Sequence, residues 1–370
     1  MDAAGARRVL AGLWILDGSL QLLPRMFTMF MVQSVLRPPV LGEPTWLAHL
    51  TQAILVGGSQ HLVFLNLGLA ALHVGLGIAL LLWRGGRAWP YWWSLTWSAG
   101  VWVFGEGLGG VLTGQGSLIT GAPGSAVLYA VLTWAAWPPS SRPGGSRGRR
   151  RAITAVLGCF WAFGAALQAF PALCTAAGLS QMLIGNVNTY QPRWVNALMR
   201  WGAAGLAAHP VAANASLIVI MALIAAGIWA GGRPRRIALA GSMAFAALAW
   251  VFGQAFGMLL MVMTTDPNTA PVFVALAFWS GSGPHQRPSR AGQGARGMAG
   301  CGSGRHPRRA PSRGGPATPP ERGATGRPPA RPGCPRSAKA VPPASSGHCS
   351  GRSRARSRSR AVCAPSSPLR

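Results

Sequence analysis

Long apolar runs separated by short polar segments fill the chain from about residue 9 to residue 280. Several of these runs approach the ~20 residues that a helix needs to cross the hydrocarbon core of a bilayer, and they contain almost no charged residue. We expect spans at residues 9–32, 59–83, 89–113, 122–138, 152–174, 203–231, 236–263 and 268–280. The pattern thus predicts an all-α fold, a polytopic membrane helical bundle of about eight transmembrane helices.

One phrase of this apolar region occurs twice, as WVFGEGLGG at residues 102–110 and as WVFGQAFGM at residues 250–258. The same offset of 148 residues pairs other uncommon residues: Pro44 with Pro192, Trp46 with Trp194, Gly57 with Gly205, His61 with His209, Asn66 with Asn214, and Pro123 with Pro271. An offset of 147 residues pairs Trp14 with Trp161, Gln21 with Gln168, Pro24 with Pro171, and Thr28 with Thr175. Rare residues that match in order across such a span predict a tandem duplication.

The duplication predicts two parallel four-helix repeats, at residues 1–140 and 152–280, joined by a basic cytoplasmic linker at residues 141–151. Each repeat has a long loop between its first two spans, and we expect an interfacial helix there. Pro123 and Pro271 are expected to begin the short fourth helices, where a missing N–H is tolerated. The glycines of the repeated phrase have the G-x-x-x-G spacing that favours close helix packing.

Arginine placement gives an independent prediction of the topology, because short cytoplasmic loops are enriched in Lys and Arg. With four spans per repeat, all the clusters fall on one side: Arg7 and Arg8, Arg84 and Arg87, Arg142 with Arg147 to Arg151, and Arg233 with Arg235 and Arg236. We therefore expect a multi-pass protein of the cell membrane with both termini in the cytoplasm. An even number of spans also gives the two repeats the same orientation.

The composition changes abruptly after the last apolar run. Residues 281–370 are rich in Arg, Pro, Gly and Ser, and they hold 18 of the 34 Lys and Arg residues. Such a segment cannot bury a core, so we expect it to be disordered. We favour translation of a shifted reading frame over a basic tail that binds RNA or anionic lipid, and nucleic acid is not an expected partner.

Two acids lie within predicted spans, Asp17 and Glu106. An acid in a membrane helix costs ~2.5–3.5 kcal/mol on insertion scales, so it normally faces the bundle interior and has a partner. Their counterparts in the second repeat are Gly164 and Gln254, so neither charge belongs to the shared scaffold. We predict one asymmetric intramembrane polar site in the first repeat. Its candidate residues are Asp17, Glu106, Gln254, Gln21 and Gln168.

Glu106 has two interpretations that the sequence leaves open. It is either an uncharged acid that hydrogen-bonds to a neighbouring helix, a role that Gln254 fills through its amide, or a proton carrier together with Asp17.

A second candidate site consists of paired histidines. His61 and His209 each begin a second span, and each is followed five residues later by an asparagine, Asn66 and Asn214. Symmetric histidines from two helices are able to ligate a haem iron. The alternative, which we favour, is a hydrogen-bonded pair near the outer surface, because both residues lie close to span ends.

The sequence identifies no catalytic residue and favours a protein that is not an enzyme. None of the six cysteines has the C-x-x-C spacing of a zinc or redox site, so we expect no metal site of that kind. Cys159 and Cys174 are expected to be buried as small apolar residues.

The pattern RxxxGxWxxDGxxQLxPxxF, from Arg8 to Phe27, resembles the first helix of DoxX-like membrane proteins. A weaker similarity continues through residues 217–250, where one helix ends in GGRPRR and another begins. The resemblance implies a four-helix bundle per repeat and, by association with a quinone oxidoreductase subunit, a membrane redox partner. It assigns no catalytic residue.

Three functions follow from these features. The leading expectation is an accessory membrane protein, embedded in the lipid bilayer, that binds a lipophilic molecule such as a quinone. The second is a proton-coupled transporter that uses Asp17 and Glu106. The third is a haem-binding redox subunit that uses His61 and His209.

Overall fold

The structure is a computed structural model that describes residues 2–38, 41–82, 88–138 and 145–282. The described residues belong to one compact unit, Met1–Arg290. The predictions for the tail after residue 282 lie outside the described residues.

All regular structure in the described residues is helical, so the predicted all-α fold is confirmed. The α-helices are α1 (Ala3–Gln21), α2 (Met29–Met31), α3 (Thr45–Gln60), α4 (Leu62–Leu82), α5 (Trp89–Gly100), α6 (Ser125–Ala136), α7 (Gly145–Gln168), α8 (Ala176–Ile184), α9 (Arg193–Ala208), α10 (Pro210–Ala230), α11 (Gly232–Phe252) and α12 (Thr269–Gly281). Shorter 3₁₀ or π segments connect several of them.

Four helices of the described chain are long and apolar enough to cross a membrane: α4, α10, α11 and residues 147–168 of α7. Two shorter helices, α6 and α12, are also apolar. An 18-residue stretch of α10 has a mean hydropathy of 2.3, yet only 28% of this stretch is buried inside the protein. A surface this apolar is stable when lipid covers it, which fits a membrane protein.

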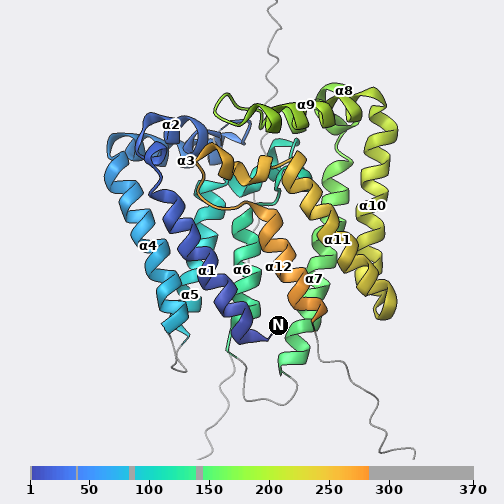
Figure 1. The fold of residues 1–370 in the computed structure, drawn as a ribbon, viewed down its shortest axis with the longest axis horizontal. Coiled ribbons are helices and arrows are strands. Elements are labelled where there is room, and N and C mark those ends of the chain that lie inside the picture. The colour runs from blue at the N-terminus through green and yellow to red at the C-terminus, as the bar shows by residue number, and fades with distance from the viewer. Residues whose placement is uncertain (1, 39–40, 83–87, 139–144, 283–370) are drawn as a thin grey trace, which may run out of the picture. The chain divides into compact units, whose positions relative to one another are not determined.

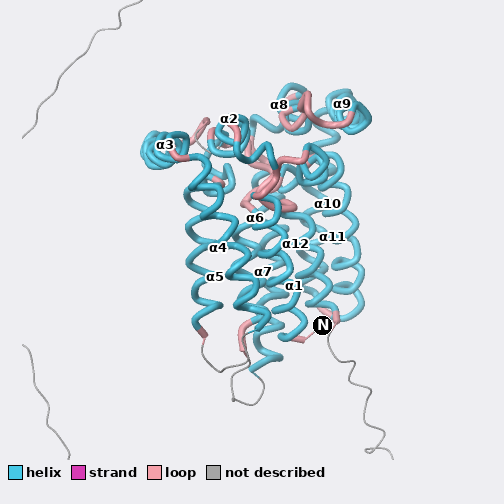
Figure 2. Tube along the Cα trace, turned by 60° about the vertical axis from the view of Figure 1, so that its left-hand side comes forward, coloured by secondary structure: helices cyan, strands magenta, loops and turns pink. Residues whose placement is uncertain are grey.

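The long helices run side by side, and the short helices α2, α3, α8 and α9 lie across one end of them (Figures 1 and 2). The N-terminus lies at the opposite end, where α7 begins and where α10 turns into α11 (Figure 1). Within this bundle α1 packs along α4, and α7 packs along α10. Glycine makes the first contact close, because a Cβ added to Gly18 would lie 2.8 Å from the Ala70 carbonyl oxygen.

Several predicted helix boundaries are wrong, and proline explains two of them. The first span was expected at residues 9–32, but α1 ends at Gln21 because Pro24 cannot continue it. The fifth was expected at residues 152–174, but α7 ends at Gln168, three residues before Pro171. The first predicted long loop, residues 33–58, contains most of α3, and α2 lies within the first predicted span. The second, residues 175–202, contains α8 and the start of α9, two helices where one was expected.

The repeated phrase does not pack as a G-x-x-x-G helix. α5 continues as a π-helical segment, Val101–Gly105, and α11 ends at Phe252. Beyond these points the chain enters 3₁₀ segments whose central residues have positive φ. Gly109 has φ +68° and Gly257 has φ +62°, a region that favours glycine. A Cβ on either residue would collide with the carbonyl of a proline, Pro123 or Pro267. The phrase therefore ends a helix and brings its end against the start of the next.

The fourth helices of the two repeats begin two residues after Pro123 and Pro267, not at Pro123 and Pro271 as expected. The Trp102 Nε1 donates to the Pro123 carbonyl oxygen at 2.7 Å, and the Trp250 Nε1 donates to that of Pro267 at 2.9 Å. Pro267 is thus the geometric counterpart of Pro123. The loop before α12 is shorter by four residues than the sequence alignment assumed.

Cys159 and Cys174 are exposed rather than buried. They lie on α7 and just after it, on surfaces that the described chain does not cover.

Candidate functional site

Asp17 lies in the C-terminal half of α1 and is only 2% exposed. Its Oδ1 has no hydrogen-bond partner among the described residues. Tyr129 of α6 faces the carboxyl closely enough to interact with it, yet the tyrosine hydroxyl also lacks a well-formed hydrogen bond. Among the described residues, no cationic group acts on Asp17. An acid in this setting has neither of the usual compensations for burial, a counter-ion or a full set of donors.

A third acid, Asp266, completes this region, and sequence reasoning missed it. It lies in the loop before α12, where Oδ2 accepts from the Thr265 hydroxyl at 2.9 Å and Oδ1 accepts from the Asn268 N–H at 2.7 Å. Burial raises the pKa of Asp266. Its charge also acts on Asp17 and on Glu106. In the sequence, this acid was indicated only by the polar run TTDPN between two apolar segments.

Asp266 borders a cavity of about 170 Å³ at the end of the bundle covered by the short helices. Its other lining residues are Ser34, Val35, Gly105, Gly257, Met258, Met263, Thr264, Thr265 and Asn268. Because Ser34 and Val35 belong to the segment that follows α2, the cavity lies on the side of the long loops.

Glu106 caps a helix. Its Oε1 accepts from the Ser125 hydroxyl at 2.6 Å and from the Ala126 N–H at 3.1 Å, both at the first turn of α6. A carboxyl oxygen is favourable there because the first N–H groups of a helix have no partner within the helix. These contacts occupy the side chain in a structural role.

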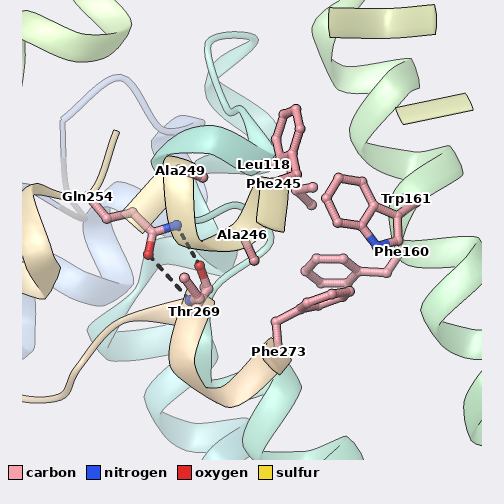
Figure 3. A pocket seen from close by; sticks show the side chains of 10 residues that line it. Leu118, Phe160, Trp161, Phe245, Ala246, Ala249, Gln254, Thr269 and Phe273 are labelled. Atoms are coloured by element: carbon pink, nitrogen blue, oxygen red, sulfur yellow. Dashed lines mark hydrogen bonds between the residues drawn. The ribbon is translucent and has the colours of Figure 1, made fainter. Parts of the chain in front are cut away.

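Gln254 makes the same contacts in the second repeat. Its Nε2 donates to the Thr269 hydroxyl at 2.8 Å, and its Oε1 accepts from the Ala270 N–H at 3.3 Å, at the first turn of α12 (Figure 3). The acid and the amide thus perform one job at two helix starts. This arrangement is the hydrogen-bonding alternative considered for Glu106.

Beside Gln254 lies a small apolar cavity of about 20 Å³. Its walls are mainly aromatic and alanine side chains, among them Trp161, Phe245 and Phe273, which converge on it from three helices (Figure 3). Trp161 packs edge-on against Phe273, with ring centroids 5.4 Å apart. A space of this size holds at most about one water molecule.

The same place in the first repeat is polar. Trp14 packs against Tyr129 with ring centroids 4.7 Å apart, as Trp161 packs against Phe273. The Trp14 indole donates to the Ser94 hydroxyl at 3.0 Å, and Ser94 in turn bonds to Thr133 at 2.8 Å. In the second repeat, by contrast, the Trp161 indole nitrogen has no hydrogen-bond partner among the described residues.

His73 also belongs to this polar region, although it was not among the candidates from the sequence. It is 6% exposed, in the middle of α4, and its Nε2 accepts from the Trp97 indole at 2.7 Å. Its ring lies 5.2 Å from that of Trp14, and its Nδ1 has no partner among the described side chains. The corresponding position of the second repeat is Met221.

Gln21 and Gln168 occupy matching places at the C-terminal ends of α1 and α7. The Asn66 amide donates to the backbone oxygen of Gln21 at 2.5 Å, and the Asn214 amide donates to that of Gln168 at 3.0 Å. All four side chains are buried. Each asparagine thereby joins the first helix of a repeat to the second.

The structure does not bring the two candidate histidines together. His61 ends α3 and His209 ends α9, and both side chains are exposed. The helices that follow them, α4 and α10, lie on opposite sides of the bundle (Figures 1 and 2). Asn66 and Asn214 bond to the glutamine residues rather than to these histidines. The geometry therefore offers no paired axial ligands for haem.

Within the described residues no three His, Cys, Asp or Glu side chains gather closely enough to hold a metal ion. Polar side chains instead meet in pairs near the C-terminal half of α1, where Tyr129 faces Asp17 and Asn66 bonds to the backbone of Gln21. Comparison with known proteins gave no match to a family model, to a curated protein or to a solved structure.

Proposed function

We propose that this chain is a proton-coupled membrane transporter in which Asp17 carries the proton. The single observation that carries the proposal is the state of Asp17, which is buried in a membrane protein with a free oxygen and without a cation. Intramembrane acids of this kind mark proton relays and ion pathways. A side chain that served only packing would be fully hydrogen-bonded or apolar.

Asp266 is the second acid of the proposed path, in place of Glu106. It borders the cavity on the side of the long loops and acts electrostatically on Asp17. Two carboxyl groups that interact disfavour the state in which both are charged, so we propose that the pair holds a proton. Glu106 is excluded from the path because its oxygens are held by the start of α6.

The proposed architecture is eight spans in two parallel repeats of four that resemble DoxX-like four-helix units, with both termini cytoplasmic. Matched geometry supports the repeats: α3 and α9 each have 16 residues, and α4 and α10 each have 21. The orientation is supported by the ends of the bundle. The arginine-rich starts of α1, α7 and α11 lie opposite the short helices (Figure 1).

The other expected functions have less support. A drug-sized or quinone-sized ligand usually occupies about 300–1,000 Å³. The cavities beside Asp266 and beside Gln254 measure about 170 Å³ and about 20 Å³. Haem binding through His61 and His209 is not supported because the two residues lie apart.

Solute-induced currents from proteoliposomes on a solid-supported membrane test the transport function. We expect a current with at least one member of a panel of amino acids, sugars, organic acids and alkali cations. The current is abolished in Asp17→Asn and kept in Glu106→Gln, the control in which capping of α6 is retained. Silence with the whole panel, or equal currents from Asp17→Asn, would contradict the proposal.

A further inference from the structure

The two Gln–Asn pairs differ in how their oxygens are satisfied. In the second repeat Gln168 Nε2 donates to Asn214 Oδ1 at 2.8 Å, and the Ser117 hydroxyl donates to Gln168 Oε1 at 2.8 Å. Both side-chain oxygens of this pair therefore have a donor. We call this pair closed, because neither side-chain oxygen lacks a hydrogen-bond donor.

The pair in the first repeat is open. Gln21 Oε1 and Asn66 Oδ1 have no hydrogen-bond partner in the described chain, although Gln21 is 2% exposed and Asn66 is 0% exposed. The orientation of Asn66 is set by chemistry, because a backbone carbonyl only accepts and so must face the Nδ2. Its Oδ1 is thereby directed away from that bond and left without a donor.

The missing donor has a structural cause. Ser117 reaches Gln168 from the loop that precedes α6. The loop that precedes α12 lies over the end of α1, where Arg25 donates to the Met261 carbonyl oxygen at 3.1 Å. The two threonine hydroxyls of this loop bond within the loop itself: Thr264 donates to the Asp266 backbone oxygen, and Thr265 donates to the Asp266 carboxyl.

Asp17 adds a third oxygen to this group. It precedes Gln21 by four residues on α1, so the two side chains share a helix face. Its Oδ1 also lacks a well-formed hydrogen bond, although the Tyr129 hydroxyl faces the carboxyl, and the matching residue of the second repeat is Gly164. Buried acceptors without donors are costly, and here three of them occur along one side of α1.

We propose that Asp17, Gln21 and Asn66 bind a monovalent alkali cation, Na⁺. Carboxylate and amide oxygens are the ligands that hard cations prefer, and one carboxylate balances a single positive charge. A water molecule offers only two donors and no charge. This inference rests on the proposed transport function, because it names the ion that shares Asp17 with the proton. Binding of the ion is nevertheless measurable without transport.

Purified protein in lipid nanodiscs tests this site in two ways: thermal unfolding in NaCl, KCl or choline chloride, and saturable binding of ²²Na⁺. We expect Na⁺ to raise the Tm relative to choline and ²²Na⁺ to bind at one site. Asp17→Asn and Gln21→Met weaken both effects at least tenfold in Na⁺ concentration. Equal Tm values in NaCl and choline with no saturable ²²Na⁺ binding, as a buried water alone would give, overturn the proposal.

The closed pair supplies the matched control. Gln168→Met removes hydrogen bonds to Ser117 and Asn214, so it lowers the Tm in choline while leaving the Na⁺-dependent increase intact. A Na⁺ effect that Gln168→Met removes and Gln21→Met keeps would place the ion elsewhere and overturn the assignment. Solute-driven currents that depend on Asp17 but persist without any Na⁺ binding would overturn this inference alone and leave the transport function standing.

Discussion

Asp17 on α1 and Asp266 in the loop before α12 interact electrostatically, although they come from opposite ends of the described chain. One is buried with a free oxygen, and the other borders a polar cavity. The second repeat has no such arrangement, because Gly164 and Phe273 occupy the places of Asp17 and Tyr129. The repeats thus build one scaffold, and the polar residues of the first make it asymmetric.

The stability of Asp17→Asn separates a functional acid from a structural one. We expect the variant to be at least as stable as the wild type in sodium-free buffer, because it removes a buried charge without a partner. Asp17→Leu serves as the comparison, because leucine is similar in shape to aspartate but has no polar atom in its side chain. Thermal unfolding in choline chloride is the measurement, and a loss of more than about 2 kcal/mol in Asp17→Asn would show that the carboxyl holds the fold together.

Glu106 is expected to tolerate glutamine and not leucine. Glutamine retains an oxygen for the Ala126 N–H, as Gln254 does for Ala270, whereas leucine leaves the start of α6 without a cap. Loss of a cap costs about 0.5–2 kcal/mol. Unfolding of Glu106→Gln and Glu106→Leu in detergent measures the difference, and Gln254→Leu should behave as Glu106→Leu does. Equal stability of Glu106→Leu and the wild type would refute the capping role.

Gly109 and Gly110 form a matched pair for testing the break after the repeated phrase. Their φ values are +68° and +67°, but a Cβ on Gly109 meets the Pro123 carbonyl, whereas a Cβ on Gly110 meets nothing within 4 Å. Gly110→Ala should cost about 1–2 kcal/mol from backbone conformation alone. Gly109→Ala should cost clearly more. If expression and thermal stability of the two variants are equal, the close contact with Pro123 is absent.

Topology is tested by reporter fusions. We expect fusions after Gly145 and after Gly283 to be cytoplasmic and a fusion at Asn186 to be external. The reason is that the arginine-rich helix starts lie at one end of the bundle and the short helices, between which Asn186 lies, at the other. A cytoplasmic signal at Asn186 would be incompatible with parallel repeats.

Hydropathy predicted the all-α fold because apolar runs of membrane length leave few alternatives. It placed helix ends less well, since the run from Val9 to Val32 stays apolar across the break that Pro24 imposes. The predicted start of the fourth helix of the second repeat was also wrong. Pro271 matched Pro123 in the alignment, but the carbonyl that Trp250 contacts belongs to Pro267.

The candidate site was predictable only where a residue was unusual for its place in the sequence. Asp17 stood out as a charge within an apolar run, and the Gln and Asn residues stood out as repeated polar positions. Asp266 did not, because it lies between two predicted spans, where an acid is ordinary. Its importance comes from the fold, which brings that loop over the end of α1.

Proton movement driven by a sodium gradient is the most direct test of Asp17 as the ion-carrying group. Proteoliposomes that contain a pH-sensitive dye would be given an inward Na⁺ gradient, with choline as the control. We predict that wild-type protein and Glu106→Gln make the lumen more alkaline as protons leave, and that Asp17→Asn produces no change. Proton movement of equal size in Asp17→Asn, or none in the wild type, would contradict the account.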